Sequence, residues 1–474
     1  MVMPTLPSYA ATQVIVVGSG LAGLSAASQL ASHKIPVRLL ERSTKLGGNS
    51  IKASSGINGA PTKYQSLATP DAKFYEDTVK SAGPAFISSE NSQRQKLVET
   101  LTSSSSSAID WLVDEKGIDL CTVAQLGGHS LPRTHRGSGQ LPPGAAIVTT
   151  LLKDLRTNPL VQVETSCIVT KIIQSQGQAT GVEYTFGGEK RLLKGPVVFA
   201  SGGFAGDAHG MLAKYRPDLA DIPSTNEPRP GSQNLLIDVG AQPLDMNLVQ
   251  VHPTSFVDPK DPSNPLKFLA AELLRGEGGL LLHSGKRFVN EMETRQHITD
   301  TIMRILPAKD TTSSLRQWDV TLVLDEGCYE AAKSHIDFYL WKGLMVKTTV
   351  GDLKDSESAI ISIQDYSDMA AGRAEDPYGR KAFAHWTLGQ VTLESVVYVG
   401  RITPAIHFTM GGVMFNERSE VLDGNRQPIK GLWAAGEVTG GLHGENRLGG
   451  SSLLECVVFG RIAGDQASAF YKKL

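Results

Sequence analysis

The stretch VIVVGSGLAG, residues 14–23, places Gly18, Gly20 and Gly23 directly after a run of β-branched residues. Glycines with this G-x-G-x-x-G spacing are typical of the turn between the first strand and the helix of a βαβ unit. The first two permit a tight turn and a close approach of the backbone to a pyrophosphate, and the third lets the helix pack against the strand. The stretch therefore predicts a nucleotide-binding turn.

The residues after the glycines complete the predicted unit. Leu24 to Ala31 is small and apolar and predicts a helix, and Val37–Leu40 predicts a second strand that ends at Glu41. An acid about 20 residues after the second glycine is placed to bind ribose hydroxyls. Strand, helix and acid in this order favour dinucleotide binding over the alternative, a tight βα turn without a ligand.

Two later segments repeat the pattern of an apolar strand that opens on a small-residue turn. They are Val197–Ala200 and Gly431–Glu437, so the start and the end of the chain both predict strands of one nucleotide-binding domain. The interpretation is a discontinuous domain, with 1–250 as its first part and 407–474 as its second. Residues 251–406 form an inserted domain.

Three shorter segments have local sequence patterns of their own. Phe268–Leu274 is an amphipathic stretch within the inserted segment. The serine run 103–107 predicts a loop or a polar helix face, and 308–314 is a polar stretch.

Composition excludes several classes of protein. Lys+Arg 46 against Asp+Glu 48 gives a net charge of −2, which argues against a nucleic-acid partner because such proteins need a basic excess. No run of 18 apolar residues exists, so no membrane segment is predicted. Cys121, Cys167, Cys328 and Cys456 are far apart and predict no metal site. We expect a cytoplasmic protein. The sequence does not exclude a mitochondrial form in which an upstream start adds a targeting segment.

Three further motifs extend the similarity beyond the first unit. Gly47-Gly48-Asn49 follows the acid, as is typical of flavin-type units in which the chain passes close to the flavin. Near the end stand Ala435-Gly436-Glu437 and Asn446-Arg447-Leu448-Gly449-Gly450. Together with the first turn, these motifs resemble the fumarate reductase/succinate dehydrogenase flavoprotein family over nearly the whole chain. The closest likeness is to its soluble fungal fumarate reductases.

The resemblance implies an α/β fold, with a discontinuous Rossmann-like FAD-binding domain and an inserted α+β capping domain. It also implies FAD, with Glu41 on the adenosine ribose and Glu437 near the ribityl chain. Membrane-bound members attach the flavin through a histidine, whereas Asn49–Ser54 has none, so non-covalent binding is expected. The cofactor-binding residues that follow are Gly18, Gly20, Leu21, Ala22, Gly23, Glu41, Arg42, Gly47, Gly48, Asn49, Ser50, Ser54, Ser55, Gly56, Ala200, Ser201, Gly202, Gly436, Glu437, Arg447, Gly450, Ser451, Ser452 and Leu453.

Charged and histidine-bearing motifs gather at the two predicted domain junctions. A C4 dicarboxylate carries two charges, and a desolvated site holds them best with arginines, which donate two parallel hydrogen bonds. Hydride transfer to its double bond also needs a positioned acid. The resemblance implies Arg295 as this acid, with Glu272 and Arg275 relaying the proton. The substrate-binding residues that it implies are His252, Thr254, His407, Arg447 and Gly128.

The activity that the resemblance implies is reduction of fumarate to succinate. Electrons would come from an external donor, either a reduced free flavin or a separate reductase. One alternative is a flavin-dependent ene-reductase or desaturase that acts on another carboxylate-bearing alkene. A second is L-aspartate oxidation, and a third is a catalytically idle flavin-binding protein.

Two departures from the family pattern stand out. Ala271 occupies the position before the relay glutamate, where many relatives have threonine. The loop Thr225–Gln233 lacks the acid of the usual Thr-Gly-Asp-Gly turn and is about one residue shorter. Both positions are therefore expected to alter substrate contact, flavin affinity or the access of the electron donor.

Overall fold

The computed structural model describes residues 13–87, 91–139, 141–308 and 314–474. Its first lobe is built on a sheet whose strands, in spatial order, are β20, β21, β10, β1, β2 and β6. β1 pairs in parallel with β2 and β10, so the first predicted unit is a parallel βαβ unit. The bounds are β1 Val14–Val17, β2 Val37–Leu40, β6 Val161–Glu164, β10 Val197–Phe199, β20 Glu420–Leu422 and β21 Pro428–Ala434.

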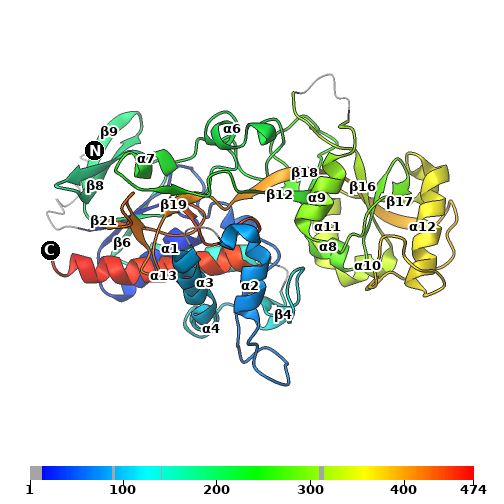
Figure 1. The fold of residues 1–474 in the computed structure, drawn as a ribbon, viewed down its shortest axis with the longest axis horizontal. Coiled ribbons are helices and arrows are strands. Elements are labelled where there is room, and N and C mark those ends of the chain that lie inside the picture. Colours follow the sequence, from blue (N-terminus) through cyan, green and yellow to red (C-terminus); the bar gives the residue numbers. More distant parts are fainter. Residues whose placement is uncertain (1–12, 88–90, 140, 309–313) are drawn as a thin grey trace, which may run out of the picture.

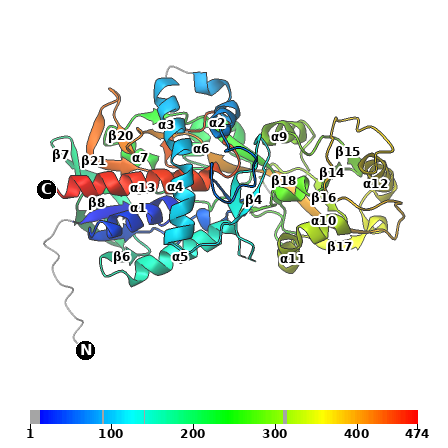
Figure 2. The same ribbon diagram turned by 90° about the horizontal axis from the view of Figure 1, so that it is seen from below.

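Helices from both ends of the chain cover one face of this sheet. α1 (Leu21–Ser32) and α13 (Ser451–Tyr471) lie side by side, with α5 (Pro143–Thr157) beside α1 (Figure 2). Small residues allow this contact, because a Cβ at Gly460 would lie 2.5 Å from the Ala22 carbonyl oxygen. The helices that pack beyond them are α2 Phe74–Ala82, α3 Asn91–Ser103 and α4 Ser105–Asp110.

An antiparallel sheet lies against the other face. Its strands are β7 (Ile168–Ser175), β8 (Gln178–Phe186) and β9 (Glu189–Lys194), and buried residues of β7 and β8 join Ile15 and Phe199 in one core. Short elements complete the lobe: β3 Ile57–Asn58, β4 Thr122–Ala124, β5 Thr134–Arg136, β11 Pro243–Leu244, β19 Gly412–Met414, β22 Thr439–Gly440, α6 Met211–Tyr215 and α7 Gln233–Ile237.

The second lobe is mixed α and β and is connected to the first by two long strands, β12 (Val249–Phe256) and β18 (Val396–Thr409) (Figure 1). These strands pair antiparallel, with Gln250 opposite Phe408. The sheet order is β13, β12, β18, β16, β14 and β15, and β17 pairs with β18. The other elements are β13 Phe268–Leu269, β14 Leu280–His283, β15 Lys286–Arg287, β16 Val320–Leu324, β17 Val346–Thr349, α8 Leu273–Gly276, α9 Arg295–Met303, α10 Glu326–Ala331, α11 Lys333–Lys342 and α12 Ser356–Ala370.

The second lobe has its own hydrophobic core. That core includes buried residues before position 250, among them Phe204, Leu212 and Ile222. It therefore draws on a part of the chain that the sequence analysis assigned wholly to the nucleotide-binding domain. No described helix is long and apolar enough to cross a membrane.

Local expectations differ from the structure in detail. The first helix begins at Leu21, three residues before the apolar run that predicted it. The amphipathic stretch Phe268–Leu274 divides between two elements, since Phe268 and Leu269 pair with β12 and a helix begins only at Leu273. The serine run, for which a loop or a polar helix face was predicted, is helical except for a turn at Ser104, which agrees with the second alternative. Of the polar stretch 308–314, residues 309–313 lie outside the described part.

Candidate functional site

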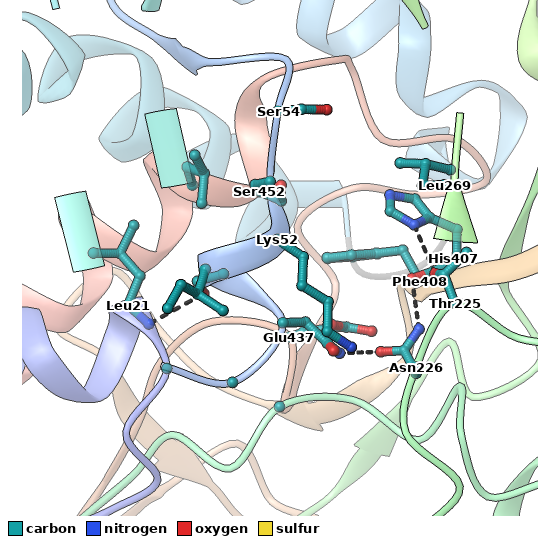
Figure 3. Close-up of a pocket in the computed structure, with 18 of the residues that line it drawn as sticks. Leu21, Lys52, Ser54, Thr225, Asn226, Leu269, His407, Phe408, Glu437 and Ser452 are labelled. Carbon is teal, nitrogen blue, oxygen red and sulfur yellow. Dashed lines mark hydrogen bonds between the residues drawn. The ribbon is translucent and has the colours of Figure 1, made fainter. Parts of the chain in front are cut away.

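A cavity of about 1270 Å³ lies between the two lobes and takes its walls from both. Leu21 and Ser452, at the starts of α1 and α13, face His407 and Phe408 of β18 across it (Figure 3). The parallel strands of the first lobe end here, at the edge where sheets of this kind bind ligands.

The glycine-rich turn shapes one end of the cavity. Gly18 has φ +103° and a Cβ there would lie 2.3 Å from the Ala200 carbonyl oxygen, so only glycine fits. A Cβ at Gly23 would lie 2.0 Å from the Gly18 carbonyl oxygen. Glycine at this position therefore allows α1 to pack closely against the turn that precedes it. The N-cap of α1 is Gly20, which supplies no side-chain cap. The Leu21 N–H donates to Ser50 Oγ at 3.1 Å.

Glu41 is buried at the end of β2 and lines the same end of the cavity. Its Oε2 accepts hydrogen bonds from the Ser19 N–H (2.9 Å) and hydroxyl (2.6 Å), and its Oε1 accepts one from the Ser43 N–H (2.8 Å). These bonds fix the carboxylate where β2 ends. The neighbouring Arg42 donates to the Pro230 carbonyl at 2.8 Å, and burial, with Arg229 nearby, lowers its pKa.

Glu437 also lines the cavity, beside β18. Its Oε1 accepts hydrogen bonds from the Thr409 N–H (2.9 Å) and hydroxyl (3.2 Å). Burial raises the pKa of Glu437 to about 7, and Glu455 adds to this rise, while the Thr409 hydrogen bonds and Arg447 oppose it. Glu437 is thus a carboxyl group that is partly neutral at neutral pH.

The structure brings most of the predicted cofactor residues to this one cavity, and three of them lie behind its wall. Gly23 packs on the turn, Gly47 packs against Val148, and Ser451 accepts a hydrogen bond from the Asn58 amide at 3.1 Å. Those that line the cavity are Gly18, Gly20, Leu21, Ala22, Glu41, Arg42, Gly48, Asn49, Ser50, Ser54, Ser55, Gly56, Ala200, Ser201, Gly202, Gly436, Glu437, Arg447, Gly450, Ser452 and Leu453.

Three predicted catalytic residues form a contiguous charged cluster. Arg295 begins α9, and its Nε donates to Glu272 Oε2 at 3.1 Å, while its Nη2 binds the same oxygen. Arg275 lies one helical turn from Glu272, with its Nη2 3.7 Å from Glu272 Oε1. Arg275 also donates to the Glu291 carbonyl at 3.0 Å. Only Arg295 of the three lines the cavity, and the other two lie behind it.

The arginines keep Glu272 ionised despite its burial. Burial by itself raises the pKa of this carboxyl, but Arg295 and Arg275 outweigh it and lower the pKa to about 2. Glu272 is therefore a carboxylate at physiological pH, and it lies against the guanidinium groups of both Arg295 and Arg275.

Gln250, which the sequence analysis missed, joins this cluster to Arg447. Its side-chain oxygen accepts from Arg295 Nη1 at 3.2 Å and from Arg447 Nη2 at 3.3 Å, and its Nε2 donates to Asn446 at 2.7 Å. Arg447 also lies over the Phe408 ring, 4.6 Å from its centroid. Burial, with Arg295 nearby, lowers the pKa of Arg447 to about 10. The only local signal for Gln250 was its place two residues before His252.

Two histidines, the buried His252 and the half-buried His407, flank the arginines. The His252 and His407 rings lie edge to face, 5.5 Å apart, on the paired strands β12 and β18. Burial and neighbouring arginines hold both pKa values well below the usual range, so both rings are neutral. His407 Nδ1 lies 3.1 Å from the Thr225 hydroxyl, and His252 Nδ1 contacts the Thr254 backbone N–H at 3.2 Å. His252 Nε2 is buried without a partner among the described residues.

Gly128 supports the site from behind. It has φ +83°, and a Cβ there would lie 3.1 Å from Leu448 in the segment that carries Arg447. The next residue, His129, contacts the Gly449 carbonyl at 2.9 Å and Arg133 at 2.9 Å. This loop therefore holds the Arg447 segment and does not itself line the cavity.

The unusual loop Thr225–Gln233 covers the middle of the cavity. The Asn226 amide donates to the His407 carbonyl at 3.0 Å and also binds Asn49. Lys52 and Glu227 form an exposed ion pair at 3.3 Å at its edge. The loop is thus tied to both lobes.

The donors and the space fit FAD. The cavity is long, its end carries an uncapped helix start and a buried acid, and Gly202, with φ +82°, has open space where a side chain would point. One oxygen of Glu455, which lines the cavity, is buried without a partner among the described residues. A polar ligand that reaches the whole cavity would satisfy such groups.

Comparisons with known proteins agree with this geometry. The family model described as FAD binding domain matches residues 13–453. The chain is 43% identical to fumarate reductase 1 of Saccharomyces cerevisiae (95% of this chain, 97% of that protein) and 40% identical to the fumarate reductase of Schizosaccharomyces pombe (97% and 90%). The solved open conformation of a flavocytochrome c3 fumarate reductase has a TM-score of 0.78 and 30% identity, covering 97% of this chain and 78% of that one.

Fold and site together define an FAD-binding flavoprotein. More narrowly, the chain belongs to the fumarate reductase family of these flavoproteins. The resemblance to soluble fungal fumarate reductases and the predicted α/β flavoprotein fold are thereby confirmed.

Proposed function

We propose that the protein is an FAD-dependent oxidoreductase acting on a CH–CH bond, which reduces fumarate to succinate. The observation that carries this is the group of Arg295, Arg447 and His407 on the wall of a flavin-sized cavity, with His252 packed behind His407. Two converging guanidinium groups suit the two carboxylates of a small dicarboxylate. The similarity to two fungal fumarate reductases over nearly the whole chain supports the same activity.

FAD would be held non-covalently. Glu41 would bind the adenosine ribose, the start of α1 the pyrophosphate and Glu437 the ribityl chain. The segment Asn49–Ser54 contains no histidine that could form a covalent bond to the ring. When bound, FAD supplies the hydride for the reaction.

The substrate carboxylates would be held by neutral and cationic donors. Arg447 would bind one carboxylate, and His252, His407 and Thr254 the other, with Gly128 supporting the loop behind them. Burial of these groups strengthens each interaction, because little water competes. Charge that develops on a polarised carboxylate is thereby stabilised.

Arg295 would deliver the proton. It lines the cavity, and Glu272 lies against it. A guanidinium does not remain deprotonated in a protein, so the proton must be replaced at once. Glu272, ionised and in contact with both arginines, would pass a proton from Arg275 to Arg295. Water would be excluded by residues 251–406 acting as a capping domain over 1–250 and 407–474.

The remaining assignments are an electron donor outside this chain, either a reduced free flavin or a separate reductase, and a cytoplasmic location. The test of the activity is anaerobic. The enzyme's flavin is reduced and mixed with excess fumarate, and the oxidised-flavin absorbance is followed. Rapid reoxidation with formation of succinate is expected, and denaturation should release FAD. Reduced flavin that persists with fumarate, but is oxidised by another unsaturated acid, would instead indicate an ene-reductase.

A further inference from the structure

The cavity continues past the residues assigned to FAD, along the inner face of the second lobe. Its outer part is lined by β13 and by Ser334, His335, Phe338, Tyr339 and Lys342 of α11, whose spacing places them on one face of that helix. The whole cavity, about 1270 Å³, exceeds the ~1,000 Å³ upper end of ordinary ligand pockets. The outer part lies beyond the residues assigned to FAD and to the substrate.

Aromatic rings form the floor of this outer part. The Phe338 ring lies 5.5 Å from Phe268 of β13 and 6.0 Å from Trp341. Phe338 is 39% exposed and Trp341 79% exposed, although both are large and apolar. Exposed clusters of this kind mark binding surfaces. Planar heterocycles stack well on such rings.

A lysine lies directly over these rings. Lys342 Nζ is 5.2 Å from the Phe268 centroid and 5.8 Å from the Phe338 centroid. Within the described ranges, no carboxylate forms an ion pair with Lys342. Asp258 and Asp261 share the wall, but both already accept hydrogen bonds from their own loop. Lys342 is therefore available to an anion such as a phosphate.

The outer part is continuous with the part assigned to the cofactor. Leu269, next to Phe268 in β13, lines the same cavity as His407 (Figure 3). A planar ligand on the Phe268 and Phe338 rings would therefore share one chamber with the enzyme's flavin. The two electrons that each turnover consumes have to reach that chamber.

We propose that this outer part binds the electron donor, a dihydroflavin that carries a phosphate, such as reduced flavin mononucleotide. Its ring system stacks on the exposed Phe338 ring, beside Phe268, and its phosphate binds Lys342. The inference rests on the proposed function and names the donor's site. In net terms the dihydroflavin loses two electrons and two protons and leaves as the oxidised flavin. The enzyme's flavin gains the same two electrons and two protons, so atoms and charge balance.

The first test compares two dihydroflavins as donors for the FAD-loaded enzyme with saturating fumarate. Lys342→Glu should raise the KM for reduced flavin mononucleotide about 2- to 5-fold, as loss of one exposed charge contact does. It should leave the KM for reduced riboflavin, which has no phosphate, unchanged. Phe338→Ala should raise both KM values. Lys354→Glu, with the same charge change on an 83% exposed side chain, should change neither.

A direct binding measurement supports the kinetics. Titration of FAD-loaded enzyme into oxidised flavin mononucleotide should quench its fluorescence, more weakly in Lys342→Glu and Phe338→Ala. In each variant, enzyme reduced in advance should be reoxidised by fumarate at the wild-type rate, because the fumarate site is untouched. If that step fails in the wild type, the proposed function is wrong, whereas the titration still reports on the donor site.

Two results would overturn the donor site. One is wild-type KM values and quenching in both variants. The other is turnover sustained by a reduced nicotinamide dinucleotide or a protein reductase but by no free dihydroflavin.

Discussion

The Arg295 guanidinium lies against the Glu272 carboxylate, with Nε 3.1 Å from Oε2. One residue begins α9 and the other precedes α8, so the contact joins two separate parts of the second lobe. It also fixes the one member of this charged cluster that lines the cavity. Arg295 is thus oriented by a buried anion toward the place where the substrate would bind.

Replacing Arg295 should therefore abolish turnover without removing FAD. Arg295→Ala is expected to lower kcat about 10²- to 10⁴-fold, the usual contribution of a positioned acid. Arg295→Lys keeps a positive charge beside Glu272, so a loss of activity in this variant is not explained by an unpaired Glu272 that misfolds the protein. Steady-state reduction of fumarate and the flavin absorbance of the purified variants measure the two effects. Arg304→Ala, at the other end of α9, is the control, and retained kcat in Arg295→Ala would remove this residue from the acid role.

Gln250 holds two guanidinium groups apart with a single oxygen. Gln250→Leu removes that acceptor, so the guanidinium groups of Arg295 and Arg447 would repel one another with no shared hydrogen-bond acceptor between them. We expect the KM for fumarate to rise about 10-fold, as the loss of a buried hydrogen bond to charged groups suggests. Gln296→Leu on the surface of α9 should leave the KM unchanged. An unaltered KM in Gln250→Leu would show that the arginines are positioned by other contacts.

The first lobe could be read from the sequence because its signals are local. The run Val14–Val17, the glycines after it and Glu41 follow one another along the chain, and each has its own steric or charge requirement. The helix start at Leu21 was missed by three residues because Leu21, Ala22 and Gly23 were assigned to the turn.

The substrate cluster depended on pairing of distant segments. His252 and His407 meet because β12 and β18 pair antiparallel, and no local pattern predicts that register. They were singled out only through the family motifs. Gln250 belongs to no such motif, and an amide in an apolar strand gives no sign of its partners. The pattern of Phe268–Leu274 did not show where the stretch divides, because Phe268 and Leu269 form a strand by pairing with the separate segment β12.

The close contact of α1 with α13 predicts a steric cost at Gly460. A Cβ there would lie 2.5 Å from the Ala22 carbonyl oxygen, which is backbone and cannot turn aside. Gly460→Ala should lower the free energy of unfolding by about 1–3 kcal/mol, the cost of overpacking a core. Gly389→Ala is the control, since nothing lies within 4 Å of a Cβ there. Urea denaturation measures both, and equal stabilities would show that the helices move apart freely.

Glu437 should make stability depend on pH. Burial raises its pKa from 4.5 to about 7, so the folded state favours the neutral carboxyl. The resulting stabilisation is complete below about pH 4.5 and is lost as the pH rises through 7.

At 1.36 kcal/mol per pKa unit, the loss is at most about 3 kcal/mol. Glu437→Gln keeps the shape of the group but cannot ionise, so it should remove this part of the pH dependence. Urea denaturation of flavin-free protein between pH 4.5 and 8 gives the difference between wild type and variant at each pH. Glu445→Gln, an exposed carboxyl in the same segment, serves as the control. A difference that stays constant across this range would mean that Glu437 ionises as readily in the folded protein as in the unfolded chain.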